Sequence, residues 1–110
     1  MPGFNLDERV RLSIEMALTA EGHSSLRQRQ DVEARGLGMS GAEIDAARRG
    51  RSFDAWTSIA LALARAACQG DDAELKNHRE KVLSSGISEV TCQEIEEFAE
   101  RVASPHLKPG

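Results

Sequence analysis

The sequence predicts an all-α fold of about six helices, and three observations support this prediction. Apolar residues recur three and four positions apart along most of the chain, whereas no segment alternates apolar and polar residues for long enough to form a strand. Aromatic residues make up only 4% of the 110 residues, and there is no Tyr. The core must therefore be built from Leu, Ile, Val and Ala, which suits close helix packing. A chain of this length is expected to form one domain over residues 1–110.

Two helices are expected before residue 35. The first covers residues 6–19, where apolar side chains share one helical stripe, namely Leu6, Val10, Ile14, Ala17 and Leu18. Gly22 separates it from a more polar helix, which begins at Ser24 or Ser25 and runs to about Ala34. Only Leu26 and Val32 give this second helix an apolar side.

The third helix is short and has a clear start signal. It follows a turn at residues 36–38, and the spacing of Ser40 and Glu43 is that of a capping box. In that motif the serine hydroxyl accepts from the third backbone amide, while the glutamate reaches back to the cap. The helix is expected to run to Arg49 and to end at Gly50.

The second half of the chain predicts three more helices. One opens at Ser52 or Asp54 and ends at Gly70; it is apolar nearly all round, which is typical of a central helix. The next covers residues 71–84, with acidic residues in its first turn, where negative charge is favoured. Ser88 caps the last helix, whose apolar face comprises Cys92, Ile95, Phe98, Ala99 and Val102. Prolines at 105 and 109 predict a flexible tail over about residues 104–110.

The two halves share a weak repeat. Gly38-Met39-Ser40 and Gly86-Ile87-Ser88 lie 48 positions apart (86 − 38), and each follows a polar helix that an apolar helix precedes. A duplicated helical hairpin would explain this pattern, and so would chance.

Composition and charge favour some classes of function over others. The net charge of −4 argues against nucleic-acid binding, and the basic cluster of Arg48, Arg49 and Arg51 fits a helix C-terminus better than a phosphate site. Cys68 and Cys92 form no CxxC, so we expect two core thiols and neither a disulfide scaffold nor a metal or cofactor site. We see no signal peptide and no apolar run long enough for a bilayer, and expect a cytoplasmic protein without membrane contact.

One acid–histidine pair stands out as a candidate site. His78 shares a helical stripe with Leu75 and Val82, and Glu74 precedes it by one turn. A carboxylate there would fix the tautomer of the imidazole and raise its basicity, which is how a general base for neutral pH is built. The alternative is a structural one, because an i, i+4 Glu–His pair is often surface decoration and a lone His at a helix seam is usually a packed residue. The repeat places Gln30 and Leu26 at the matching positions of the first half.

The stretch from about Ile59 to Glu94 resembles the carboxymuconolactone decarboxylase family and the wider AhpD-like superfamily. The matching features are the apolar helix from Ile59 to Ala64, the run Ala73-Glu74-Leu75, then His78 and Gly86-Ile87-Ser88. The first half looks like a divergent version of the same pattern. The resemblance implies an AhpD-like orthogonal helical bundle and a homo-oligomer.

The same resemblance implies two kinds of chemistry. The decarboxylase branch acts on a muconate-derived lactone, which suggests a small carboxylated substrate. The AhpD branch uses a CxxC just before the His, but here Asp71 and Glu74 occupy those positions, so thiol-based peroxidase or disulfide reductase activity is not expected. The C-terminal helix is also shorter than in the family, which would leave an apolar face for a second subunit.

Two hypotheses follow. In the first, the protein is a His-based lyase in which His78 is the acid/base, Glu74 orients it, and Arg79 or Lys76 attracts a carboxylate substrate. In the second, the chain is a non-catalytic helical module for self-association or partner binding, since no third catalytic group is evident.

Overall fold

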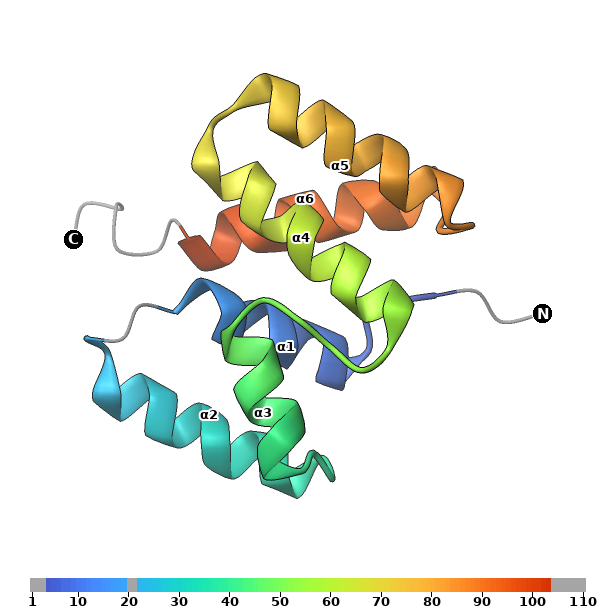
Figure 1. Ribbon diagram of the computed structural model, residues 1–110. Coiled ribbons are helices and arrows are strands. Elements are labelled where there is room, and N and C mark those ends of the chain that lie inside the picture. Colours follow the sequence, from blue (N-terminus) through green and yellow to red (C-terminus); the bar gives the residue numbers. More distant parts are fainter. Residues whose placement is uncertain (1–3, 20–21, 104–110) are drawn as a thin grey trace.

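The computed structural model describes residues 4–19 and 22–103, and within these ranges the protein forms six α-helices and no strand (Figure 1). The helices are α1 (Glu8–Leu18), α2 (Ser24–Gly36), α3 (Gly41–Arg48), α4 (Ala55–Gln69), α5 (Asp72–Ser84) and α6 (Glu89–Ala103). The all-α prediction is thereby confirmed, and the helix ends agree with the expected ones to within about two residues. The flexible tail predicted over residues 104–110 lies outside the described residues.

The helix starts are fixed locally by side chains that accept backbone amides. Asp7, Asp54 and Asp71 cap α1, α4 and α5 in this way. The capping box predicted for α3 is confirmed: Ser40 Oγ accepts from Glu43 N at 3.1 Å, and Ser40 N donates to Glu43 Oε1 at 2.8 Å.

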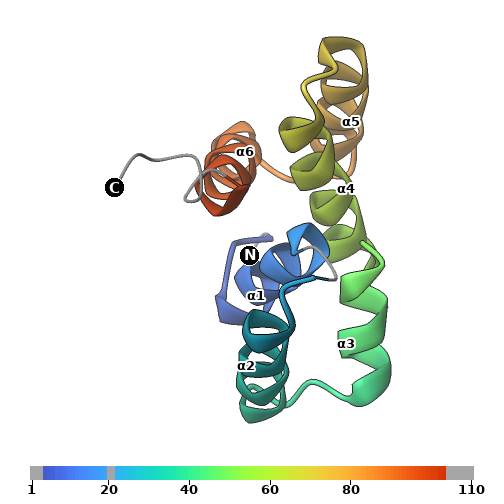
Figure 2. The ribbon, with the colours of Figure 1, turned by 90° about the vertical axis from the view of Figure 1, so that its left-hand side faces the viewer.

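Helix α1 is shared by two apolar cores. One of its sides carries Val10 and Ile14 into a cluster with α4, α5 and α6. Its other side carries Leu12 and Met16 into a second cluster with α2 and α3. Figure 2 shows α1 between α2 below it and α4 and α6 above it. The two halves are therefore joined through buried side chains on opposite faces of one helix.

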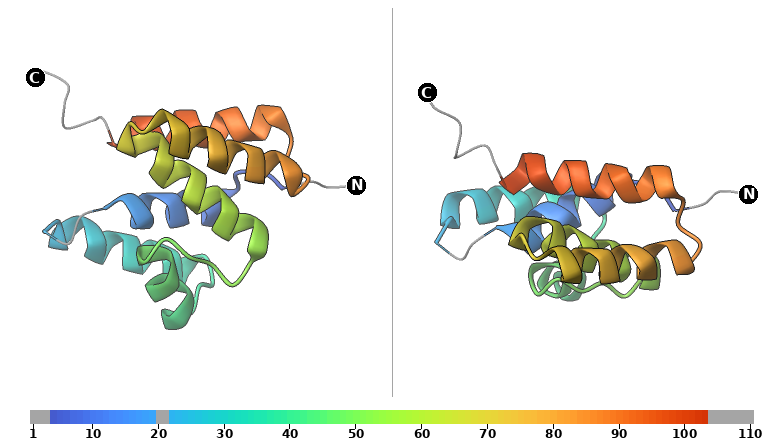
Figure 3. Two further views of the ribbon diagram at one scale, coloured as in Figure 1. Left: turned by 45° about the horizontal axis from the view of Figure 1, so that its top comes forward. Right: turned by 90° about the horizontal axis from the view of Figure 1, so that it is seen from above.

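Helix α4 is central within the second half, as predicted. It packs against α5, α6 and α1, and Ala60, Leu61, Leu63 and Ala64 are fully buried along it. The molecule measures about 36 × 36 × 20 Å, and the left view in Figure 3 shows the α5–α6 pair at one edge and α2 and α3 at the other. Among the described residues, no helix is long and apolar enough to cross a membrane.

The two halves repeat the same three-helix pattern. A shift of 48 positions carries α2 onto α5 at both ends and the start of α3 onto the start of α6. Gly38 and Gly86, which precede α3 and α6, both have positive φ, +89° and +100°. The repeating unit thus has three helices, one more than the hairpin that the sequence suggested.

An ion pair recurs in the repeat with its charges exchanged. In the first half, Asp31 on α2 accepts from Arg48 on α3, with Oδ1 2.6 Å from Nη2. The same shift of 48 leads to Arg79 on α5 and Glu96 on α6, whose nearest oxygen lies 2.8 Å from Nη2. Equivalent positions in the two units are therefore joined by the same type of contact, although neither residue type is retained.

Val32, which the sequence placed on the apolar side of the second helix, is exposed, and so are Phe53 and Leu83. Val32 is 70% exposed because the buried side of α2 carries Gln30 and Ala34 instead. Phe53 is 74% exposed because it precedes α4, which begins only after the Asp54 cap. Leu83 is 39% exposed, since Val82 beside it fills the α5 stripe.

Candidate functional site

The Glu74–His78 pair forms on α5 as its spacing predicted. His78 Nε2 lies 3.5 Å from Glu74 Oε2, and the two side chains are 25% and 53% exposed. A pair that is this open to water contributes at most about 1 kcal/mol to stability. The pair is thus present, with Glu74 exposed to solvent and His78 only partly exposed.

Two charged neighbours of this pair, Asp71 and Arg79, are occupied by structural contacts. Asp71 accepts the backbone N–H groups of Ala73 and Glu74 as the cap of α5. Arg79 donates from Nε and Nη2 to the two carboxylate oxygens of Glu96, both at 2.8 Å. Lys76 is exposed. Of the two predicted substrate-binding cations, Arg79 would have to give up a bidentate partner in order to hold a substrate.

Gln30, the first-half equivalent of His78, has a structural role at this position. Gln30 is 2% exposed and links three elements through its amide. Its Nε2 donates to Thr19 Oγ1 at 3.0 Å, and its Oε1 accepts from Arg48 Nη1 at 3.2 Å. Arg48 is therefore more than a charge at a helix end: it also holds α2 to α3.

The two thiols have different surroundings. The prediction of a core thiol is right for Cys92, which is 1% exposed, and wrong for Cys68, which lies at the surface with Sγ 3.5 Å from the carbonyl oxygen of Ala99. Partial desolvation of the Cys68 thiol and burial of the Cys92 thiol raise the pKa of both, and nearby carboxylates act in the same direction. Both are therefore protonated at neutral pH and are poor nucleophiles. Across the described ranges, no group of three or more His, Cys, Asp or Glu side chains could hold a metal ion.

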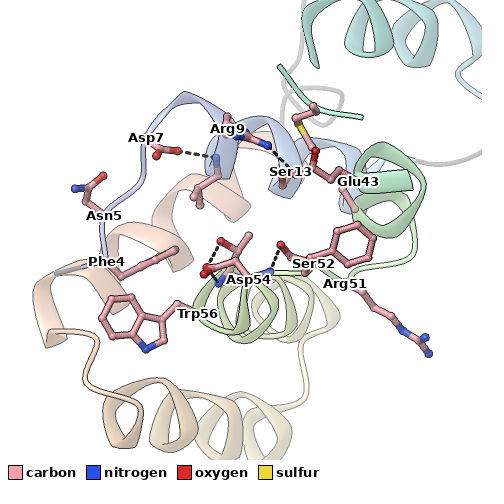
Figure 4. Close-up of a pocket in the computed structure, with 15 residues that line it drawn as sticks. Phe4, Asn5, Asp7, Arg9, Ser13, Glu43, Arg51, Ser52, Asp54 and Trp56 are labelled. Atoms are coloured by element: carbon pink, nitrogen blue, oxygen red, sulfur yellow. Dashed lines mark hydrogen bonds and ion pairs between the residues drawn. The ribbon is translucent and has the colours of Figure 1, made fainter. Parts of the chain in front are cut away.

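A cleft of about 610 Å³ lies between α1, α3 and the start of α4 (Figure 4). This volume is within the range of sites that bind small molecules. The side chains that surround it come from the segment before α1, from α1 itself, from α3, and from the segment 51–57. His78 and Glu74 are not among them.

Aromatic and apolar side chains form one part of the wall. Phe4 and Trp56 meet edge to face, with ring centroids 6.1 Å apart and planes at 82°. Trp56 is held from behind by a hydrogen bond of 3.0 Å from its Nε1 to the carbonyl oxygen of Ser85. Val10 and Met39 contribute apolar surface, and the exposed ring of Phe53 stands at the edge.

Phe53 also borders a second, smaller cleft of about 350 Å³ on the outer side of α3. Arg51 and Ser52 line both clefts, so the segment that joins α3 to α4 forms the partition between them. This segment is fixed at Ser52, whose N–H donates to Ser58 Oγ at 2.8 Å and whose carbonyl oxygen accepts from the same hydroxyl at 3.0 Å.

The polar groups of the larger cleft are mostly paired within its wall. Arg9 Nη2 donates to Glu43 Oε2 at 2.7 Å. Asp54 Oδ2 accepts from both Thr57 N and Thr57 Oγ1, at 2.8 and 2.7 Å. Ser13 is 5% exposed, and Figure 4 shows it beside Arg9 and Glu43, across the opening from Ser52 and Asp54.

Sequence reasoning did not find this cleft, because its residues are scattered between positions 4 and 57. The one local signal was Ser13, a polar residue between the apolar positions Leu12 and Ile14. No protein-family model, curated protein or solved structure matches the chain.

Proposed function

We propose that the chain is a non-catalytic helical binding module whose small-molecule ligand occupies the cleft between α1, α3 and α4. The observation that carries this proposal is the cleft itself, about 610 Å³ in volume and walled by Phe4, Trp56 and Val10. The cleft combines aromatic and apolar side chains with charged and hydroxyl groups, and a concave site of this size is a usual place for a ligand.

The surroundings of the acid–histidine pair favour binding over catalysis. A catalytic pair needs further groups that converge on a substrate. Here Asp71 caps a helix and Arg79 is engaged by Glu96. Asp71 and Glu74 also stand where the AhpD branch has its two cysteines, which argues against thiol redox chemistry.

The chain offers its own reporter for a test. Trp56 is the only tryptophan and lines the cleft, so its indole N–H gives a single resolved NMR signal at the site. A fragment library that includes uncharged, anionic and cationic compounds should contain members that shift this signal in a saturable way. Those shifts should vanish in Ser13→Leu, which fills the cleft, and persist in Val90→Leu, which enlarges an exposed side chain on α6. A library without any saturable Trp56 shift would contradict the proposal.

A His-based lyase is the second candidate, and the 3.5 Å separation of Glu74 and His78 favours it. His78 would deliver the proton to carbon as CO₂ leaves, Glu74 would orient it, and Lys76 or Arg79 would attract the carboxylate. Turnover of a muconate-derived lactone that His78→Gln abolishes would establish this reading. Unchanged turnover in that variant would exclude His78 as the acid/base.

We also propose that the chain belongs to the AhpD-like superfamily, arose by duplication, forms a homo-oligomer and is cytoplasmic. The repeated three-helix pattern supports duplication, since α5 reproduces the bounds of α2 after a shift of 48. Light scattering at several protein concentrations tests the oligomeric state, and a monomer at all of them would contradict it.

A further inference from the structure

We infer that the cleft between α1, α3 and α4 selects an uncharged, flat molecule that carries a hydrogen-bonding group such as an amide, hydroxyl or carbonyl. This inference names the ligand class of the cleft and therefore rests on the proposed function. It follows from which groups in the wall are already paired and which can still bind.

The carboxylates of the wall have partners inside the protein. Asp7 Oδ1 accepts the N–H of Val10 at 2.9 Å, and Asp54 accepts from Thr57. Glu43 is held by Ser40 and Arg9, and these contacts lower its pKa, so that it remains ionised near neutral pH. Of these three carboxylates, Glu43 is paired with Arg9, while Asp7 and Asp54 cap α1 and α4, and a cationic ligand would have to share them with those caps.

The cations of the wall are equally unsuited to an anion. Arg9 lies 2.7 Å from Glu43 and would have to exchange that partner for the ligand. Figure 4 shows the side chain of Arg51 directed away from the opening. Within the described residues, an anion that entered the cleft would lose water and find Arg9 paired with Glu43 and Arg51 directed away, which is costly.

Hydroxyl groups remain available to a ligand. Ser52 Oγ accepts from Asp54 N at 3.1 Å, which leaves its own proton to donate. The hydroxyl of Ser13 lies across the opening and can donate or accept. The rings of Phe4 and Trp56 offer apolar faces and edges to a flat body. Hydroxyls on two walls and rings on a third match an uncharged, flat, hydrogen-bonding compound.

Two matched series of compounds test the ligand class. The first is benzamide, benzoate and benzylamine; the second is 2-naphthamide, 2-naphthoate and 2-naphthylmethylamine. Each series keeps the ring and changes the charge. Titrations at neutral pH, followed by the Trp56 indole signal, should show the amide binding about tenfold more tightly than either charged member of its series.

The outcomes separate the two proposals. A charged member that binds as tightly as its amide, or more tightly, overturns the ligand class but leaves the cleft as a binding site. If none of the six compounds shifts the Trp56 signal while other members of the fragment library do, the ligand class fails and the proposed function stands. If no member of the library shifts it either, both fail.

Two substitutions locate the binding. Ser13→Ala should weaken amide binding several-fold and leave the weak binding of the charged compounds unchanged, because only the hydroxyl is lost. Phe53→Ala should weaken all six, since it removes apolar wall; its control, Val90→Ala, shortens a similarly exposed side chain on α6. Neither Ser13 nor Phe53 belongs to either apolar core, so alanine at these positions leaves no cavity in the cores. Equal amide affinity in Ser13→Ala and in the unaltered protein would contradict the role of the hydroxyl.

Discussion

Substitution of Gly50 by alanine tests how α3 is joined to α4. Gly50 follows α3 with φ of +79°, a conformation that a side chain disfavours. A Cβ at this position would also overlap the guanidinium group of Arg65 and lie 3.0 Å from its Cδ. Arg65 Nη1 donates to the carbonyl oxygen of Arg49 at 3.3 Å, so the contact that caps the end of α3 would be displaced.

Gly70 provides a matched control for the free-energy cost of placing a side chain on a backbone with positive φ. Its φ is +77°, yet a Cβ there would meet nothing within 4 Å. Gly70→Ala should therefore lose only the conformational term, about 1–2 kcal/mol. Gly50→Ala should lose the same amount and, in addition, about 0.5–1 kcal/mol for the displaced Arg65 contact, which is exposed to water.

Urea denaturation followed by circular dichroism measures both losses. In an Arg65→Ala background, the cost of Gly50→Ala should fall to that of Gly70→Ala, because the overlapping side chain is gone. Equal losses for the two glycines in the unaltered background would refute the proposed role of Arg65. An undiminished cost of Gly50→Ala in the Arg65→Ala background would refute it as well.

Three further predictions concern the cores, the repeated ion pair and pH. Ile14→Ala, in the fully buried side of α1, should lower the free energy of unfolding by about 2–5 kcal/mol while unfolding remains a single transition by calorimetry; two separate transitions would contradict the shared role of α1. Arg79→Glu and Glu96→Arg should each cost about 1–3 kcal/mol in urea denaturation, because Glu96 is only 13% exposed, and the double exchange should recover most of the loss; a double variant as unstable as the sum of the single ones would show that the pair is not interchangeable. Hydrogen bonds from Ser40 lower the pKa of Glu43 in the folded state, so the ionised carboxylate stabilises the fold above its unfolded pKa, and this stabilisation is lost as the pH falls through the folded pKa. Glu43→Gln should therefore be less stable than the unaltered protein at pH 7. Thermal melts should show that this difference shrinks below about pH 4.

The candidate site was only partly predictable. The Glu74–His78 contact follows from a spacing of one helical turn, so the sequence alone indicated it. Whether the pair faces a cleft depends on which surfaces neighbouring helices cover, and here Glu74 is exposed, His78 is partly exposed and neither lines the cleft. The cleft at α1 and α4 was missed for the converse reason. Its walls depend on packing between Phe4, Ser13 and Trp56, which lie far apart along the chain.

Sequence alone determined the six helices, because their signals act over three or four residues. The caps at Ser40 and Asp71 and the apolar stripe through Val10 and Ile14 are of this kind. Tertiary structure decided which charged side chains are paired with one another and which remain available to a ligand. Asp31 and Arg48, like Arg79 and Glu96, are 17 positions apart, and only the packing of one helix on the next brings them within 3 Å. The same packing decided that Phe53 is exposed and that Ser13 faces a cleft, since burial depends on neighbours that no local pattern specifies.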